Sequence, residues 1–196
     1  MKAIREAIIL VIIALAVFFG LRLTIQTYVV FGPSMQPTFV AYERLIVNKV
    51  SYWFNGPQRG DVIVFQPPFP SAEKYIKRVI GLPGESVEVK NGITYIYTTD
   101  GKVLQLNEPY IKEKPLQDFA KYTVPAGQYF VMGDNRNSSS DSRMGWTVPR
   151  KNIVGKSLFT YWPVTKLGGS HSYRFPTASV LLPGVHVLIM NIGDIQ

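Results

Sequence analysis

Three short segments of the chain carry side chains that could do chemistry together. The first covers residues 32–38 (GPSMQPT), where a glycine and two prolines restrain the backbone around Ser34. A rigid turn of this kind suits a nucleophilic hydroxyl, which must point at an incoming carbonyl group. The segment is also open to a simpler interpretation, as a turn that enters a strand, and taken alone it favours that interpretation.

The second segment, residues 75–85 (YIKRVIGLPGE), has the pattern of a strand that contains a lysine. Side chains alternate along a strand, so Tyr75, Lys77 and Val79 share one face, whereas Arg78 faces the other way. A lysine acts as a general base only when neutral, and at its ordinary pKa of about 10.4 roughly one in a thousand is neutral near pH 7.5. Burial that lowers this pKa by about two to three units costs roughly 3–4 kcal/mol. A solvated lysine on an edge strand is the commoner alternative.

The third segment, residues 133–143 (GDNRNSSSDSR), directly follows a predicted strand and is dense in small hydrogen-bonding side chains. A hydroxyl in this loop can bond a lysine amine, and Asp141 can pair with Arg143 or Arg78 to fix the geometry. A flexible serine-rich loop is the alternative interpretation.

These segments need elements that position them, and the first is an apolar N-terminal stretch. Residues 7–21 (AIILVIIALAVFFGL) are uncharged and follow Lys2 and Arg5. Fifteen helical residues span about 22 Å, short of the ~30 Å hydrocarbon core, so we expect the helix to extend at both ends, with the stem of Arg22 reaching towards the headgroups. No small-x-small cleavage site follows, which favours a retained single span over a cleaved signal peptide. The positive-inside rule places the N-terminus in the cytosol and the rest of the chain outside it.

After this stretch, helical periodicity nearly vanishes, and short β-branched and aromatic runs recur between turn residues. The predicted strands are 45–50, 61–66, 75–80, 86–90, 93–97, 102–106, 128–132 and 153–161. Asn91-Gly92 between two of them predicts a hairpin with a type I′ turn. The pattern predicts a mainly β fold, an antiparallel folded sheet or barrel, preceded by one N-terminal transmembrane helix.

Charge and composition narrow the partners. The net charge of +8 suits nucleic acid or an anionic membrane surface, but the basic residues are scattered without a run of four, which favours lipid over nucleic acid. Because the chain has no cysteine, disulfides, thiolate zinc sites and a cysteine nucleophile are excluded. No metal or cofactor is called for, and His171 and His186 are interpreted as structural residues.

In order and type, the three segments together resemble the motifs of type I signal peptidases. Ser34 in GPSMQPT is similar to that family's nucleophile, and Lys77 in YIKRVIGLPGE to its general base. In GDNRNSSSDSR, Ser139 resembles the hydroxyl that positions the lysine, and Asp141 and Arg143 resemble its structural acid and base. By this resemblance Ser34, Lys77, Ser139, Asp141 and Arg143 are the expected site, with Arg78 as a further structural residue.

The resemblance covers about residues 22–168 and the position of the anchor. It implies a serine endopeptidase that removes N-terminal signal peptides from exported preproteins through an acyl-enzyme, cutting after Ala-x-Ala-like sites. The backbone N–H of Ser34 and the region of Gly32 are the expected oxyanion site; some members have a serine at the position of Gly32, so the second donor is left open. The residues expected to contact substrate are Tyr28, Val29, Val30, Phe31, Met35 and Ile76.

The expected organisation has three parts. Residues 1–27 form the cytosolic N-terminus and anchor, 28–168 an extracytoplasmic β catalytic domain with a smaller inserted region at about 91–125, and 169–196 a tail whose role is open. Within the tail, 180–190 could be a membrane-surface segment or an extra strand. The domain is expected on the outer or lumenal face of a plasma or thylakoid membrane, near anionic lipids and not nucleic acid.

Two other functions compete with this interpretation. A membrane-tethered basic β-domain that only binds lipid or a partner would leave Ser34 and Lys77 replaceable without loss of function. A self-cleaving Ser–Lys repressor-type protease would carry a DNA-binding helical domain at the N-terminus, where the apolar stretch stands instead.

Overall fold

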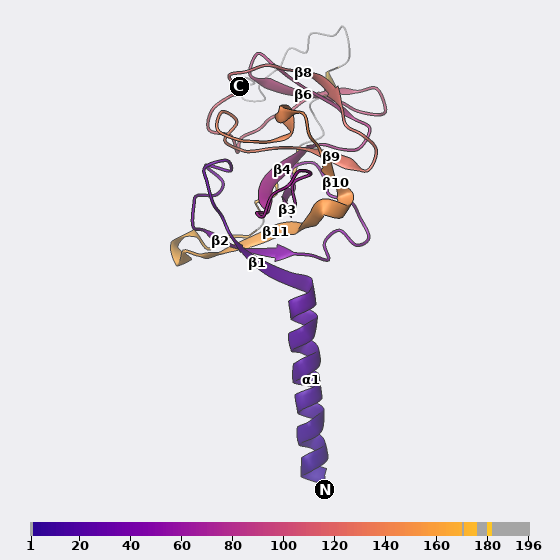
Figure 1. Ribbon diagram of the computed structural model, residues 1–196, viewed down its shortest axis with the longest axis vertical. Helices are drawn as coiled ribbons and strands as arrows, with labels where there is room; N and C mark the ends of the chain where they lie inside the picture. Colours follow the sequence, from indigo (N-terminus) through magenta and orange to yellow (C-terminus); the bar gives the residue numbers. More distant parts are fainter. Residues whose placement is uncertain (1, 170, 176–179, 182–196) are drawn as a thin grey trace, which may run out of the picture.

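The computed structural model describes residues 2–169, 171–175 and 180–181. It opens with a single long helix, α1 (Lys2–Thr24), which projects away from the β-strands (Figure 1). Its 23 residues span about 34 Å, so the helix extends beyond the predicted 7–21 stretch at both ends and can cross a hydrocarbon core. The candidate span Ile4–Thr24 has a mean hydropathy of 2.6, and none of it is buried by the rest of the chain.

The described residues after α1 form two antiparallel sheets. The seven-stranded sheet has the order β1-β2-β11-β3-β4-β9-β10, and the five-stranded sheet the order β12-β7-β6-β5-β8. The strands are β1 (Ile25–Val29), β2 (Arg44–Asn48), β3 (Val62–Phe65), β4 (Tyr75–Gly81), β5 (Ser86–Lys90), β6 (Ile93–Tyr97), β7 (Val103–Gln105), β8 (Phe119–Thr123), β9 (Gln128–Met132), β10 (Val148–Pro149), β11 (Ile153–Trp162) and β12 (Val180–Leu181). The described residues also contain three 3-10 helices: η1 (Ser142–Met144), η2 (Arg150–Asn152) and η3 (Val164–Lys166).

The predicted mainly β fold with one N-terminal apolar helix is confirmed. Each predicted strand is present, with ends shifted by at most two residues. The hairpin at Asn91-Gly92 is also confirmed: both residues have positive φ, 51° and 73°, and Lys90 pairs with Ile93 across the turn. Strands β1, β8 and β10 were not predicted, and β12 lies in the segment 180–190, for which an extra strand was one of two alternatives.

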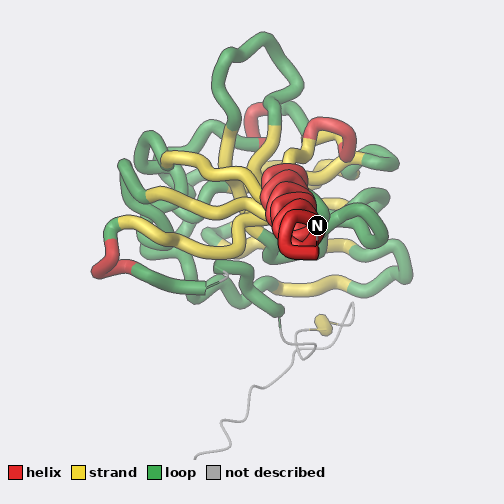
Figure 2. The backbone as a smooth tube through the Cα atoms, turned by 90° about the horizontal axis from the view of Figure 1, so that it is seen from below, coloured by secondary structure: helices red, strands yellow, loops and turns green. Residues whose placement is uncertain are grey.

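Strand β1 continues directly from α1 without a linker. Its first residue Ile25 pairs with Asn48 of β2, and the backbone N–H of Lys49 donates to the carbonyl of Thr24 at 2.9 Å. Seen from below, along the helix, the strands spread to both sides of α1 (Figure 2). The helix end is therefore tied to the edge of the seven-stranded sheet.

Strands β4 and β9 are buried on both faces because each contributes to two cores. Val79 and Val131 belong to a core within the seven-stranded sheet, whereas Ile80 and Met132 belong to the core of the five-stranded sheet. The two strands pair with each other, with Arg78 opposite Met132. The polar side chains of Lys77 and Arg78 on β4 are consequently shielded from water.

The predicted apolar segment 180–190 is only partly covered by the described residues. Val180 and Leu181 form β12, which pairs with Leu104 and Val103 of β7, so for these two residues the extra-strand alternative is correct. Residues 182–190 lie outside the described residues.

Candidate active site

The predicted nucleophile and base lie side by side. Ser34 stands in the turn that follows β1, and Lys77 projects from β4 so that its Nζ donates to Ser34 Oγ at 2.7 Å. The same Nζ donates to the carbonyl of Ile76 at 3.0 Å. Ser34 and Lys77 are 43 positions apart in sequence, yet Nζ and Oγ lie within proton-transfer distance of each other.

Burial makes the Lys77 amine a usable base. Its side chain is only 4% exposed, and this burial lowers the pKa of Lys77 to about 8, although the charges of Asp141 and Asp134 act to raise it. At a pKa of about 8, roughly a quarter of the amines are neutral near pH 7.5, compared with roughly one in a thousand for a solvated lysine. The predicted alternation is also correct, since Arg78 has contacts distinct from those of Lys77.

The turn at residues 32–38, which carries Ser34 and is named the nucleophile turn, is held in place by the 133–143 loop. Asn135 donates its backbone N–H to the Ser34 carbonyl at 3.0 Å and its side-chain amide to the Pro33 carbonyl at 3.2 Å. Among the described residues, the backbone N–H of Ser34 has no acceptor, so it is available to an oxyanion. At Gly32 the backbone has a φ of 77°, and a Cβ there would meet nothing within 4 Å.

Ser139 lies in the site but does not bond Lys77. Its buried hydroxyl has no hydrogen-bond partner among the described residues. A Cβ on Gly133 would come within 2.2 Å of Ser139 Oγ and 2.4 Å of the Ser34 carbonyl oxygen, so the glycine permits this close approach. The role of Ser139 in positioning the amine remains a prediction.

Asp141 pairs with Arg143, one of the two partners considered for it. Arg143 Nε and Nη2 donate to the two carboxylate oxygens at 2.8 and 2.9 Å. The same carboxylate accepts the backbone N–H of Gly133 at 3.0 Å, and Arg143 also donates to the Arg136 carbonyl at 2.6 Å. The pair therefore closes the 133–143 loop on itself. Pairing of Asp141 with Arg78 is not observed.

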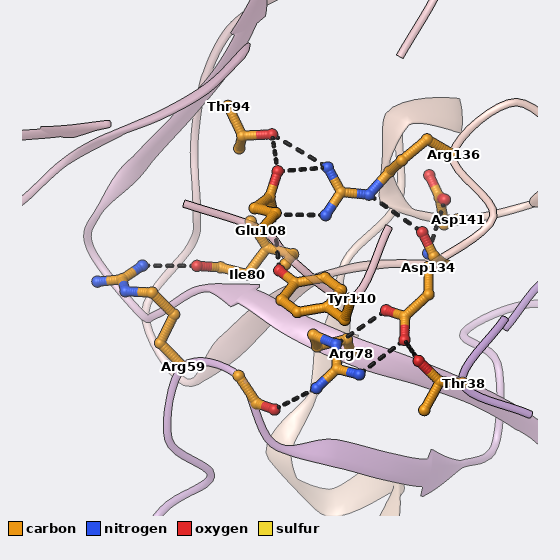
Figure 3. A network of polar contacts seen from close by, with 12 residues as sticks. Thr38, Arg59, Arg78, Ile80, Thr94, Glu108, Tyr110, Asp134, Arg136 and Asp141 are labelled. Carbon is orange, nitrogen blue, oxygen red and sulfur yellow. Dashed lines mark hydrogen bonds and ion pairs between the residues drawn. The ribbon is translucent and has the colours of Figure 1, made fainter. Parts of the chain in front are cut away.

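Arg78 pairs instead with Asp134, which the sequence analysis missed (Figure 3). Arg78 Nε and Nη2 donate to the Asp134 carboxylate at 2.8 and 2.6 Å, and both side chains are essentially fully buried. The carboxylate also accepts the hydroxyl of Thr38, which belongs to the nucleophile turn. Asp134 thus joins the strand of the base to the turn of the nucleophile. Thr38 and Asp134 lie in the segments 32–38 and 133–143 that the sequence singled out, but no sequence pattern pairs either residue with Arg78.

A second buried network supports the same loop from the five-stranded sheet. Arg136 forms an ion pair with Glu108, which also accepts the hydroxyls of Thr94 and Tyr110, at 2.8 and 2.7 Å. Arg136 Nε donates to the Gly133 carbonyl at 3.1 Å (Figure 3). Burial acts to raise the pKa of Glu108, but the Arg136 charge and the hydrogen bonds from Arg136, Tyr110 and Thr94 together outweigh burial, and the pKa is lowered. Glu108 could not be found from sequence because it stands in a stretch without strand periodicity.

A groove of about 710 Å³ leads to the dyad between the edge strand β1 and the segment before Lys77. Most residues expected to contact substrate line it: Tyr28, Val29, Val30, Phe31 and Ile76, together with Ser34 and Lys77. Met35 does not, because its side chain is 1% exposed and packs with Phe39 and Leu45 in a core below the turn. Within the described part of the chain, no three His, Asp or Glu side chains are grouped to hold a metal.

Comparison with known proteins places the chain in a family. The family described as "Signal peptidase, peptidase S26" matches residues 3–162. The chain is 42% identical over 187 residues to "Probable signal peptidase I-1" of Synechocystis sp., covering 91% of this chain and 93% of that protein. It is 45% identical over 160 residues to "Signal peptidase I" of Leptolyngbya laminosa, covering 76% of each. A crystal structure of a signal peptidase I from Enterococcus faecalis is 37% identical and aligns with 52% of this chain and 97% of that one, with a TM-score of 0.45. The chain belongs to the signal peptidase family, peptidase S26.

Proposed function

We propose that Ser34 and Lys77 form the dyad with which this serine peptidase removes signal peptides from preproteins. The observation that carries the proposal is the 2.7 Å contact between Lys77 Nζ and Ser34 Oγ, with the lysine buried and its pKa lowered to about 8. A serine nucleophile needs a base, and burial supplies one by giving Lys77 a neutral amine. Among the described residues, no histidine contacts Ser34, and its side-chain partner is Lys77.

In the first half of the reaction, neutral Lys77 takes the Ser34 proton while Oγ attacks the scissile carbonyl. The carbonyl oxygen becomes an oxyanion, which the Ser34 backbone N–H can stabilise. Lys77, now an ammonium, gives the proton to the leaving amine, the peptide C–N bond breaks, and Ser34 is left as an ester. Water then attacks the ester, Lys77 takes its proton and returns one to Ser34, and the signal peptide leaves with a free carboxylate.

Ser139 is the proposed positioning group for the Lys77 amine. Its hydroxyl is buried, has no partner among the described residues and lies next to Gly133 beside the Ser34 carbonyl. A buried hydroxyl without a partner is costly, and a bond to the lysine amine would satisfy it. The Asp141–Arg143 pair then holds the loop that carries Ser139.

The proposed substrate is an extended segment with small residues one and three positions before the cut, such as Ala-x-Ala. Because β1 is the outer strand of its sheet, its free edge can pair with such a segment by strand addition. Tyr28 and Ile76 line the groove beside the dyad, where the small side chains of the substrate would lie. Val29 and Phe31 would contribute mainly backbone.

We also propose that α1 spans a bilayer with the N-terminus in the cytosol, because Lys2 and Arg5 precede the apolar stretch. A second lipid contact would come from the loop after β2. Its Trp53 and Phe54 are 68% and 93% exposed, and it begins at Lys49, which bonds the end of α1. An exposed Trp beside a membrane-spanning helix suits the headgroup region, and the net charge of +8 suits anionic lipids rather than nucleic acid in this position.

The proposed division follows from this topology. Residues 1–27 hold the anchor, 28–168 the extracytoplasmic catalytic domain, with a smaller region at about 91–125, and 169–196 the tail. The catalytic domain would face the outside of a plasma membrane or the lumen of a thylakoid.

The test is cleavage of a preprotein with an Ala-x-Ala site by detergent-solubilised wild type, beside Ser34→Ala and Lys77→Ala. Cleavage after the second alanine by wild type alone, with both variants folded, supports the dyad. Activity retained in Lys77→Ala would assign the base to another residue. No cleavage by folded wild type across several preproteins would favour the binding-module alternative.

A further inference from the structure

A short segment beyond the family match folds back onto the buried arginine beside the dyad. The match ends at residue 162, but residues 171–175, which we name the C-terminal strap, lie against the catalytic domain. The backbone carbonyl of His171 accepts Arg78 Nη1 at 2.8 Å. Two residues on, the N–H of Tyr173 donates at 3.1 Å to the carbonyl of Gly60, which itself accepts Arg78 Nη1 at 2.9 Å.

Side chains of the strap reinforce these backbone bonds. The ring of His171 lies 4.4 Å from that of Phe39, just after the nucleophile turn, and its Nε2 is 3.0 Å from Thr160 Oγ1. The rings of Tyr173 and Phe175 lie 5.5 and 6.2 Å from Tyr110. Tyr110 in turn lies under Arg78, with the guanidinium 4.0 Å from the ring centre. The strap therefore contacts both the arginine and the aromatic ring beneath it.

Arg78 connects the strap to both members of the dyad. It is the next residue after Lys77 on β4, and its Nε and Nη2 are bound to Asp134. Asp134 holds the Thr38 hydroxyl, and the following residue, Asn135, holds the Ser34 carbonyl. One buried chain of contacts thus runs from the strap to the turn that carries the nucleophile (Figure 3 shows its central part).

We propose that the C-terminal strap is a positioning element for catalysis, completing the contacts of Arg78 and so fixing the nucleophile turn against Lys77. The inference rests on the proposed Ser34–Lys77 dyad. Arg78 is 1% exposed, so water cannot replace the acceptors of its guanidinium N–H groups. Without the strap, Nη1 loses one of its two carbonyl acceptors, and water reaches the Arg78–Asp134 pair, weakening the attraction that aligns them. A small displacement of the turn is enough to slow the reaction of a dyad that depends on a 2.7 Å contact.

The first test uses the full chain and a matched pair of glycine substitutions. A Cβ on Gly60 would lie 1.9 Å from the Tyr173 carbonyl oxygen and 3.2 Å from the Phe175 ring, so Gly60→Ala must displace the strap. Gly101→Ala is the control: its φ of 82° is close to the 88° of Gly60, so both substitutions strain the backbone, but a Cβ there meets nothing. We expect Gly60→Ala to lower kcat about tenfold or more with KM nearly unchanged, because the strap does not line the groove. Gly101→Ala keeps the wild-type kcat.

The second test removes the strap. A chain that ends at Phe175 retains it and a chain that ends at Gly169 lacks it, so their difference isolates residues 170–175. We expect the shorter chain to show the kcat loss of Gly60→Ala. We also expect the acid limb of kcat/KM to move to higher pH, because a displaced nucleophile turn admits water to Lys77, whose pKa is lowered mainly by burial. Gly60→Ala placed in the shorter chain should then cause no further loss, as required if it acts through the strap.

The outcomes separate this inference from the proposed function. A shorter chain that is folded, as judged by its unfolding midpoint, and has the kcat and pH profile of wild type would refute the positioning role and leave the dyad intact. A lowered unfolding midpoint with unchanged kcat and acid limb would also refute it, because it assigns the strap to stability alone. Failure of wild type to cleave any preprotein refutes the dyad instead.

Discussion

Replacing the proposed base with methionine should inactivate the enzyme and stabilise it. Burial holds the pKa of Lys77 at about 8, compared with an ordinary value of 10.5. Below pH 8 the folded protein must keep a buried ammonium, at a cost of about 3 kcal/mol for this difference in pKa. Lys77→Met removes that cost at similar volume and loses two hydrogen bonds, to Ser34 and Ile76, worth about 1 kcal/mol each. The net expectation is a gain of about 1 kcal/mol near pH 7.

The pH dependence gives the sign of the effect independently. The folded pKa is lower than the unfolded one, so between about pH 8 and 10.5 the unfolded chain binds more protons than the folded chain. Wild-type stability contributed by this group therefore rises with pH through that window, while the methionine variant lacks the rise. The variant should have a higher free energy of unfolding than wild type at pH 7. Above pH 10.5 its free energy of unfolding should be about 2 kcal/mol lower, because only the two lost hydrogen bonds then distinguish the proteins.

Urea unfolding of the detergent-solubilised full chain at pH 7 and pH 10.5, followed by tryptophan fluorescence, measures both values. Trp146 is a suitable reporter because it packs against the core of the seven-stranded sheet. A difference in unfolding free energy between Lys77→Met and wild type that is the same at both pH values would refute the reasoning. It would mean that the amine is solvated in the folded protein and that burial does not create the base.

Four further expectations concern the site and the membrane. The kcat/KM of wild type should rise with pH to a midpoint near 8, and Asp134→Asn should move that midpoint lower, because the charge of Asp134 raises the pKa of Lys77. The same substitution should cost about 3–5 kcal/mol in unfolding free energy, because Arg78 is left buried and unpaired. Gly133→Ala should lower kcat at least about tenfold by pushing on the Ser34 carbonyl. Ser139→Ala should lower kcat without lowering stability, because its hydroxyl has no partner among the described residues to lose. Trp53→Ser should reduce quenching of tryptophan fluorescence by brominated lipids in proteoliposomes.

Three of these substitutions, at Asp134, Gly133 and Trp53, have a matched control in the chain. Asp100→Asn removes an aspartate from an exposed pair with Lys102 and should leave kcat, its pH profile and stability unchanged. Gly169→Ala adds a methyl group where nothing lies within 4 Å, and Trp146→Phe removes a partly buried tryptophan that packs against the core of the seven-stranded sheet. Equal effects in a variant and its control would contradict the corresponding expectation.

The parts of the fold that sequence predicted are those with a local cause. Alternating β-branched runs gave most strands, and the Asn91-Gly92 turn followed from the need for positive φ. Strand β1 was missed because its residues follow an apolar helix without any turn signal. Strand β10 was missed because it is two residues long and includes Pro149.

The candidate site divides in the same way. The segments around Ser34 and Lys77 were recognisable because, together with residues 133–143, they resemble in order and type the motifs of type I signal peptidases. The burial of Lys77 was not, since it depends on β4 contributing to two cores that strand alternation cannot reveal. The pairing of Arg78 with Asp134 rather than Asp141 was equally inaccessible, because both acids stand in one loop and only its folded path decides which one reaches β4.

The direct junction of α1 and β1 fixes the distance between the membrane anchor and the catalytic serine. Thr24 ends the helix, Ile25 begins the strand, and Ser34 follows nine positions later with no flexible spacer between anchor and catalytic turn. If α1 spans the bilayer as proposed, the serine is held at a fixed height above the lipid surface, whatever the substrate. The distance between the apolar core of a signal peptide and its scissile bond is then selected by geometry, as well as by the side chains that enter the groove.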